Sequence, residues 1–192
     1  MSFRELRKGW HMTTWRIDPD HTVAEFIVRH MMVSLVHGQF NRCAGGVVFD
    51  PANMSNSSVE AEIDAGGLYT GIERRDNHLR SPDFFDVQKY PKITFKSTRV
   101  EVAAVNQLKV TGDLFIHGVT RQVTLNVETA GPSNFFDDEE NKMYTAYGFR
   151  ATTEVNREDF GMMWNLGIEQ GGFMVGKQVQ LVVNAECDLV EG

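Results

Sequence analysis

Six histidines are the residues of this 192-residue chain best suited to acid–base or metal chemistry. A metalloprotease site requires HExxH on a helix, and a facial iron site requires two histidines and a carboxylate that converge; the spacing of these residues gives neither pattern. The histidines are His11, His21, His30, His37, His78 and His117. We therefore expect neither a metal ion nor a cofactor.

His78 has the most suggestive neighbours, because it lies in the charged segment Arg75–Arg80 next to a pair of phenylalanines. In one interpretation His78, Arg75 and Asp76 act on a hydrophobic substrate at the rim of an apolar cavity. In the other, His78 is a hydrogen-bonded histidine that anchors a short helix. The residues alone leave both open.

No recognisable catalytic or nucleotide-binding loop accompanies the histidines. The GxSxG elbow of α/β-hydrolases is absent, and so are GxxxxGK[ST] and GxGxxG. His21 follows Asp18-Pro19-Asp20 and His117 precedes Gly118, so both are predicted to be turn residues. We predict that the protein is not an enzyme.

Composition excludes further classes of function. The formal net charge is −7 and no segment is dense in Lys and Arg, which argues against nucleic-acid binding. The longest stretch without charge, His30–Asn41, is too short for a membrane-spanning helix, which needs about 20 apolar residues.

The two ends and the cysteines complete the outline of the chain. Residues 1–12 are expected to be a disordered extension and residues 13–192 one domain. No secretion signal is visible, which predicts a cytoplasmic protein. Cys43 and Cys187 match no zinc-ligand spacing and are predicted to be free thiols.

The elements that must position these residues are mainly strands. From Leu108 to Ile116 hydrophobic and polar residues alternate, Gly118 supplies a turn, and Val123–Val127 repeats the pattern, which indicates a hairpin. The same pattern predicts further strands near Thr14–Ile17, Ala24–Arg29, Gly38–Asp50 (bent at 42–46), Ser57–Ala65, Lys92–Val102, Tyr144–Val155 and Gln178–Val190. Phe135–Glu140 is predicted to be a solvated acidic hairpin tip.

Only residues 73–87 favour a helix, and Pro82 interrupts it. Successive long strands with turns between them indicate an antiparallel meander, and their length favours a closed eight-stranded barrel over a sandwich. Such a barrel is filled by side chains or holds one small ligand. Glycine and alanine at several inward positions hint at a cavity, although a core filled by side chains remains the alternative.

The segment Asn156–Gly176 is unusually apolar for a loop, and it contains three methionines. Methionine adapts to variable apolar surfaces, so the loop suits a lid over a cavity or an exposed contact patch. Burial on the barrel, or a contact in a homodimer, is the alternative interpretation.

Several ordered blocks between Thr14 and Val190 resemble the YceI-like family. These blocks are Trp15-x-Ile17-Asp18-x-x-His21, Phe26-x-Val28-x-His30-Met31, Gly38-x-Phe40, Gly45-x-Val47-x-Phe49-Asp50, Arg75-Asp76-x-His78-Leu79-Arg80-Ser81-x-x-Phe84-Phe85-Asp86-Val87, Tyr90-Pro91-x-Ile93-Thr94-Phe95-x-Ser97-Thr98, Val110-x-Gly112-x-Leu114-x-Ile116-x-Gly118-Val119-Thr120, Asn156-Arg157-x-Asp159-Phe160-Gly161 and Val175-Gly176. The resemblance implies a lipocalin-like barrel that binds an isoprenoid chain of the polyprenyl or quinone type, for carriage, storage or sequestration.

Together, the pattern and the resemblance predict a set of apolar residues that contact the lipid, with the loop from Met162 to Trp164 gating access. The set is Phe26, Val28, Phe40, Val47, Phe49, Ile63, Leu79, Phe84, Phe85, Ile93, Phe95, Leu114, Ile116, Leu125, Phe149, Met162, Trp164 and Leu181. Two alternatives remain: an enzyme that uses the His78 cluster, and a dimeric assembly module without a ligand.

Overall fold

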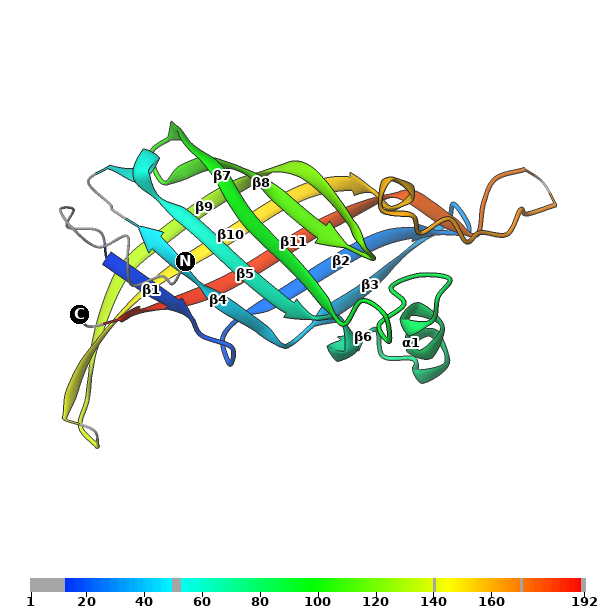
Figure 1. Ribbon diagram of the computed structural model, residues 1–192. Helices are drawn as coiled ribbons and strands as arrows, with labels where there is room; N and C mark the ends of the chain where they lie inside the picture. The colour runs from blue at the N-terminus through cyan, green and yellow to red at the C-terminus, as the bar shows by residue number, and fades with distance from the viewer. Residues whose placement is uncertain (1–12, 50–52, 140, 170, 191–192) are drawn as a thin grey trace.

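The computed structural model describes residues 13–49, 53–139, 141–169 and 171–190, so the expected extension over residues 1–12 lies outside the described residues. The described chain is mostly strand, with one short α-helix (Figure 1). The strands are β1 (Thr13–Ile17), β2 (Val23–His30), β3 (Ser34–Phe40), β4 (Cys43–Phe49), β5 (Ser58–Asp64), β6 (Leu68–Tyr69), β7 (Lys92–Ala104), β8 (Gln107–Ile116), β9 (Val119–Asp137), β10 (Lys142–Asn156) and β11 (Val175–Val190), and the helix is α1 (Glu73–Arg80).

The sheet closes on itself because β1 pairs with both β4 and β11. β11 pairs with β2 along its first part and with β1 along its last part, so β1 and β2 are two arms of one bent strand. β3 and β4 are likewise two arms, separated only by Asn41 and Arg42. Counted in this way, eight antiparallel strands form the barrel, which confirms the predicted fold, and β6 is a short addition beside β3.

α1 covers the first part of the helical segment predicted over residues 73–87 and ends at Arg80, just before the interruption predicted at Pro82. Ser81 is extended, as expected for a residue before proline, and its N–H and Oγ both donate to the carbonyl of His78. The next residues fold back in turns, and the Val87 N–H donates to the Arg80 carbonyl.

The hairpin between β8 and β9 has the expected two-residue turn. His117 and Gly118 both have positive φ, 50° and 78°, as a type I′ turn requires. β9 is much longer than the predicted Val123–Val127, because it continues past the barrel with β10 as a ribbon (Figure 1). Its last part shows no alternation of burial, since residues 130–136 are all exposed there, including Phe135 and Phe136.

Inward-facing side chains form two clusters inside the barrel. The cluster at the α1 end contains Phe26, Phe40 and Phe160, and the cluster at the opposite end contains Trp15 and Phe49. Among the described residues, no helix is long and apolar enough to cross a membrane.

Candidate apolar ligand-binding cavity

The barrel encloses a cavity of about 260 Å³ between the two clusters. This volume is close to the lower end of the roughly 300–1,000 Å³ range of small-molecule sites. The structure places every predicted lipid-contacting residue except Trp164 in its wall: Phe26, Val28, Phe40, Val47, Phe49, Ile63, Leu79, Phe84, Phe85, Ile93, Phe95, Leu114, Ile116, Leu125, Phe149, Met162 and Leu181. That these residues contact a lipid remains a prediction.

Aromatic rings stand at both ends of the cavity. Phe40 and Phe85 meet edge to face at the α1 end, with ring centroids 5.5 Å apart. Phe49 and Phe149 meet in the same way at the opposite end, 5.4 Å apart. Edge-to-face pairs of this kind hold each other's orientation, so the two ends of the wall are well defined.

Alanines, rather than glycines, leave the space between these rings. Ala61, Ala151 and Ala185 line the cavity. The expectation for glycine was wrong, because the space beside Gly112 is already occupied: a Cβ atom there would lie 2.5 Å from Cζ of Phe95. At Gly112 the ring of Phe95 therefore occupies the space that a side chain would take, whereas the three alanines border the empty space of the cavity.

Arg157 is the buried charged residue in the wall, and it follows β10 in the 3-10 helix η3 (Arg157–Phe160). Its guanidinium donates to three backbone carbonyls, those of Gly176 (3.0 Å), Val175 (3.5 Å) and Met162. Burial lowers the pKa of Arg157. The side chain therefore ties both ends of the 156–176 loop to the barrel, a role that sequence reasoning missed.

The three residues of the charged cluster do not converge on one point. The Asp76 carboxylate is buried and accepts from the N–H (2.9 Å) and the hydroxyl of Thr70, and Arg75 donates to the same threonine. His78 instead bonds through Nε2 to Asp83, at 2.9 Å. This geometry favours the anchoring interpretation, because each group holds the α1 segment to its neighbours.

Trp164 is not among the residues of the cavity wall, and its contact with a lipid stays a prediction. Its ring lies against α1, 4.7 Å from the ring of His78 and 5.4 Å from that of Phe84. The loop reverses after η3, so Met162 points inward while Met163 is 62% exposed. The 156–176 loop is therefore part wall and part exposed surface, and the alternatives left open by its sequence each describe a part of it.

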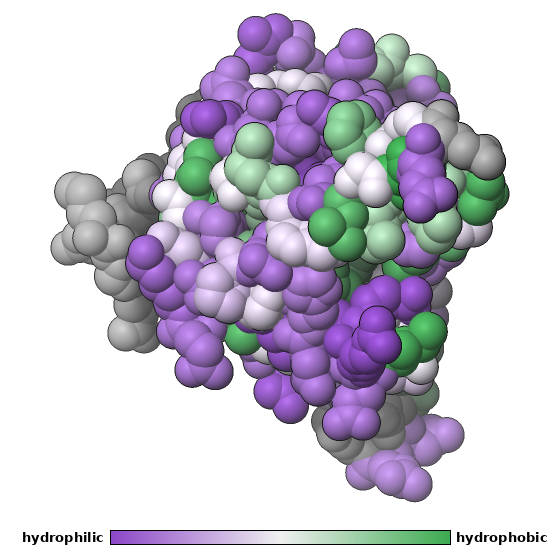
Figure 2. Space-filling model, turned by 90° about the vertical axis from the view of Figure 1, so that its right-hand side faces the viewer, coloured by the Kyte–Doolittle hydropathy of each residue, from purple (hydrophilic) through white to green (hydrophobic). Residues whose placement is uncertain are grey.

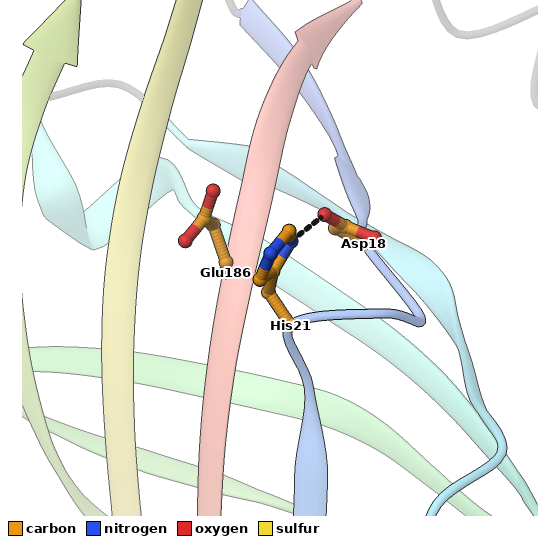
Figure 3. A group of neighbouring side chains, drawn as sticks. All are labelled: Asp18, His21 and Glu186. Atoms are coloured by element: carbon orange, nitrogen blue, oxygen red, sulfur yellow. Dashed lines mark hydrogen bonds and ion pairs between the residues drawn. The ribbon is translucent and has the colours of Figure 1, made fainter.

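A second group of titratable side chains lies at the corner between β1 and β2 (Figure 3). The group consists of Asp18, His21 and Glu186, and the side-chain atoms that could ligate a metal ion all lie within 4.8 Å of one another. The Asp18 carboxylate is 2.6 Å from Nδ1 of His21, which lowers the pKa of Asp18 and raises that of His21. The Asp18 N–H also donates to the Glu186 carbonyl, at 2.9 Å, so the pair fixes the corner of the bent strand.

Both cysteines are free thiols, as predicted, and both lie in the cavity wall. Neither cysteine is among the residues predicted to contact the lipid, although both are buried. Burial raises the pKa of Cys187 to about 12, so this thiol stays protonated at neutral pH.

This chain is similar to known proteins over most of its length. The family model of the YceI-like domain matches residues 15–187. The UPF0312 protein SA2479 of Staphylococcus aureus is 37% identical over 181 residues, which cover 94% of this chain and all of that protein.

Solved structures share the fold. BcnA of Burkholderia cenocepacia has a TM-score of 0.75 and 23% identity, with 88% of this chain and 98% of that one covered. The YCEI protein of Campylobacter jejuni has a TM-score of 0.69 and 27% identity, with 85% and 90% covered. A polyisoprenoid binding domain from Saccharophagus degradans has a TM-score of 0.64 and 18% identity, with 92% and 98% covered.

The predicted resemblance is therefore confirmed by a family model that spans nearly all of the described barrel and by relatives that align over their whole length. The chain belongs to the YceI-like family.

Proposed function

We propose that the protein binds a long-chain isoprenoid lipid of the polyprenyl or quinone type inside the barrel and stores, sequesters or carries it. The observation that carries this proposal is the cavity of about 260 Å³ whose wall is almost entirely hydrocarbon. Burial of apolar surface contributes about 25 cal/mol per Å², so a long prenyl chain needs no polar contact to bind. The described polyisoprenoid binding domain with the same fold supports this choice of ligand.

Ser57 offers a place for one polar atom of the ligand. Ser57 is among the residues that line the cavity, and its hydroxyl is buried without a hydrogen-bond partner among the described residues. A buried hydroxyl without a partner is costly, so a ligand oxygen that reached it would gain a hydrogen bond. The hydroxyl of a prenol or a carbonyl of a quinone meets this requirement.

Binding is favoured over catalysis by the state of the charged groups around the wall. Arg157 is held by backbone carbonyls and Asp76 by Thr70, so neither is directed at a bound molecule. Cys187 is a poor nucleophile, because burial raises its pKa to about 12 and the thiolate is the reactive form. The resemblance to binding proteins agrees with this interpretation.

Mass spectrometry of organic extracts from the purified protein tests the proposal, with a denatured sample and an unrelated barrel as controls. A stoichiometric prenyl or quinone species is expected. Ligand-free protein is then offered geranylgeraniol or a prenylquinone, and uptake is followed by an increase in melting temperature, because a ligand stabilises the state that binds it. Absence of both bound lipid and uptake would contradict the proposal.

A further inference from the structure

Two neighbouring turns at the α1 end of the barrel expose apolar side chains that the cavity does not use. Figure 2 shows this end, where hydrophobic side chains reach the surface among polar ones. We call the following residues the apolar collar: Met31, Met32 and Val33 from the β2–β3 turn, Leu35 from the start of β3, and Met163, Leu166 and Phe173 from the 156–176 loop.

The two parts of the collar are in direct contact with each other. The Met31 N–H donates to the carbonyl of Met174, at 2.8 Å. A Cβ atom on Gly172 would lie 3.2 Å from Cγ of Met32. The collar is therefore one surface, although its halves are more than a hundred residues apart in the chain.

The collar is also depleted of charge. Charged residues make up 23% of the chain, yet His30–Asn41 contains none and Gly161–Gly176 contains only Glu169. A surface with few charges enters an apolar environment without the large cost of removing charged groups from water.

The backbone conformation of the β2–β3 turn does not favour methionine at positions 31 and 32. Met31 and Met32 have φ angles of 49° and 63°, the left-handed values of a type I′ turn. Asn-Gly suits these positions far better, because side chains with a bulky Cβ substituent are strained there. Both methionines are about half exposed, 42% and 53%, so their burial offsets the strain only in part.

We propose that the apolar collar inserts into the surface of a neutral phospholipid bilayer and docks the α1 end of the barrel on it. Apolar tips on protruding turns suit the boundary between headgroups and acyl chains. Met162 lines the cavity and directly precedes the collar residue Met163, and Val175, which also lines it, is two residues from Phe173, so docking brings the cavity wall to the membrane. The purpose of docking, exchange of an isoprenoid with the bilayer, rests on the proposed function.

Flotation of the full chain with phosphatidylcholine vesicles tests this proposal, and the chain offers a matched pair of variants. Val33 is 81% exposed in the collar, and Val105 is 88% exposed in the β7–β8 turn at the opposite end of the barrel (Figure 1). Val33→Asp is expected to lower the partition coefficient at least about tenfold, because it places a charge at the inserted tip. Val105→Asp is expected to float as the unmodified protein does.

Binding is also expected to persist in high salt, because the collar attracts by apolar contact rather than by charge. Vesicle binding that Val33→Asp leaves unchanged, or that both variants reduce equally, would overturn the proposal. So would sedimentation showing that the unmodified protein is a dimer that Val33→Asp dissociates, with no vesicle binding: the collar would then join two copies of the chain.

A double variant, Met31→Asn with Met32→Gly, separates docking from folding. It relieves the strained turn, so we expect an equal or higher melting temperature together with vesicle binding reduced about tenfold or more. A double variant that floats as well as the unmodified protein would overturn the proposal. Uptake of geranylgeraniol from solution by Val33→Asp tests the proposed function separately, because Val33 is not in the cavity wall.

Discussion

Ala151→Leu tests whether the space inside the barrel is free for a ligand. Ala151 lies on β10 between Val127 of β9 and Val183 of β11, and its side chain lines the cavity. Leucine adds three carbon atoms, each worth about 0.8 kcal/mol when buried, which gives about 2.4 kcal/mol as an upper value. Because the cavity of about 260 Å³ can receive these atoms, the ligand-free variant should unfold with a free energy about 1–2 kcal/mol higher.

The same three carbons take space from the ligand. Geranylgeraniol affinity should therefore fall by about 10–30-fold, the equivalent of about 1.4–2 kcal/mol. Urea denaturation measures the first effect, and titration followed by tryptophan fluorescence measures the second.

Ala44→Leu is the control for this substitution, because Ala44 is exposed on the outer face of β4. It should change the unfolding free energy by no more than about 0.5 kcal/mol and leave ligand affinity unaltered. If Ala151→Leu destabilised the ligand-free protein by more than about 1 kcal/mol, as overpacking does, the region would already be full and the reasoning would be refuted.

Three further predictions concern the framework around the cavity. Gly38→Ala should destabilise the fold by about 1–3 kcal/mol in urea denaturation and weaken ligand binding. The Cβ atom of the new alanine would lie 2.1 Å from Cζ of Phe26 and push that ring into the cavity. Unchanged stability would mean that the ring has room to move. Arg157→Lys should lower the free energy of unfolding by about 2 kcal/mol in the same assay, because an ammonium group cannot donate to the three carbonyls in the geometry of a guanidinium. A decrease below about 0.5 kcal/mol would contradict the anchoring role. Asp18→Asn should reduce stability most between about pH 4 and pH 6.5. Because the pKa of His21 is raised, the contribution of His21 to stability is complete below pH 6.5 and is lost as the pH rises through the raised pKa. Because the pKa of Asp18 is lowered, the contribution of Asp18 is complete above pH 3.8 and is lost as the pH falls through the lowered pKa. A difference in stability from the unmodified protein that is the same at pH 5 and pH 9 would argue against this linkage.

Local patterns of the sequence were enough to predict most strands and most of the cavity wall. Strict alternation, as in β8, assigns Leu114 and Ile116 to the interior because a strand has one buried face. Alternation of hydrophobic and polar residues gives no guide to the outer part of β9, because residues 130–136 are all exposed and the strand has no buried face there.

The candidate site shows the same division at the level of single residues. Trp164 has the right character for a cavity wall, yet a reversal of the loop directs it to His78 and Phe84. Arg157 is a charged residue after a strand, and only the meeting of the loop's two ends explains its burial. Spacing in the chain carries no information on either contact.

By itself, the sequence determined that this is an antiparallel barrel with an apolar interior, because hydrophobic alternation and turn residues are local properties that each strand carries independently. Tertiary structure decided what is empty and what is exposed. Whether a small residue leaves a cavity depends on the side chains packed beside it: the ring of Phe95, on the paired strand β7, occupies the space beside Gly112, whereas Ala151 lines the cavity. Whether an apolar turn becomes wall or collar depends on which distant segment packs beside it, and the contact between Met31 and Met174 exists only once the barrel has closed.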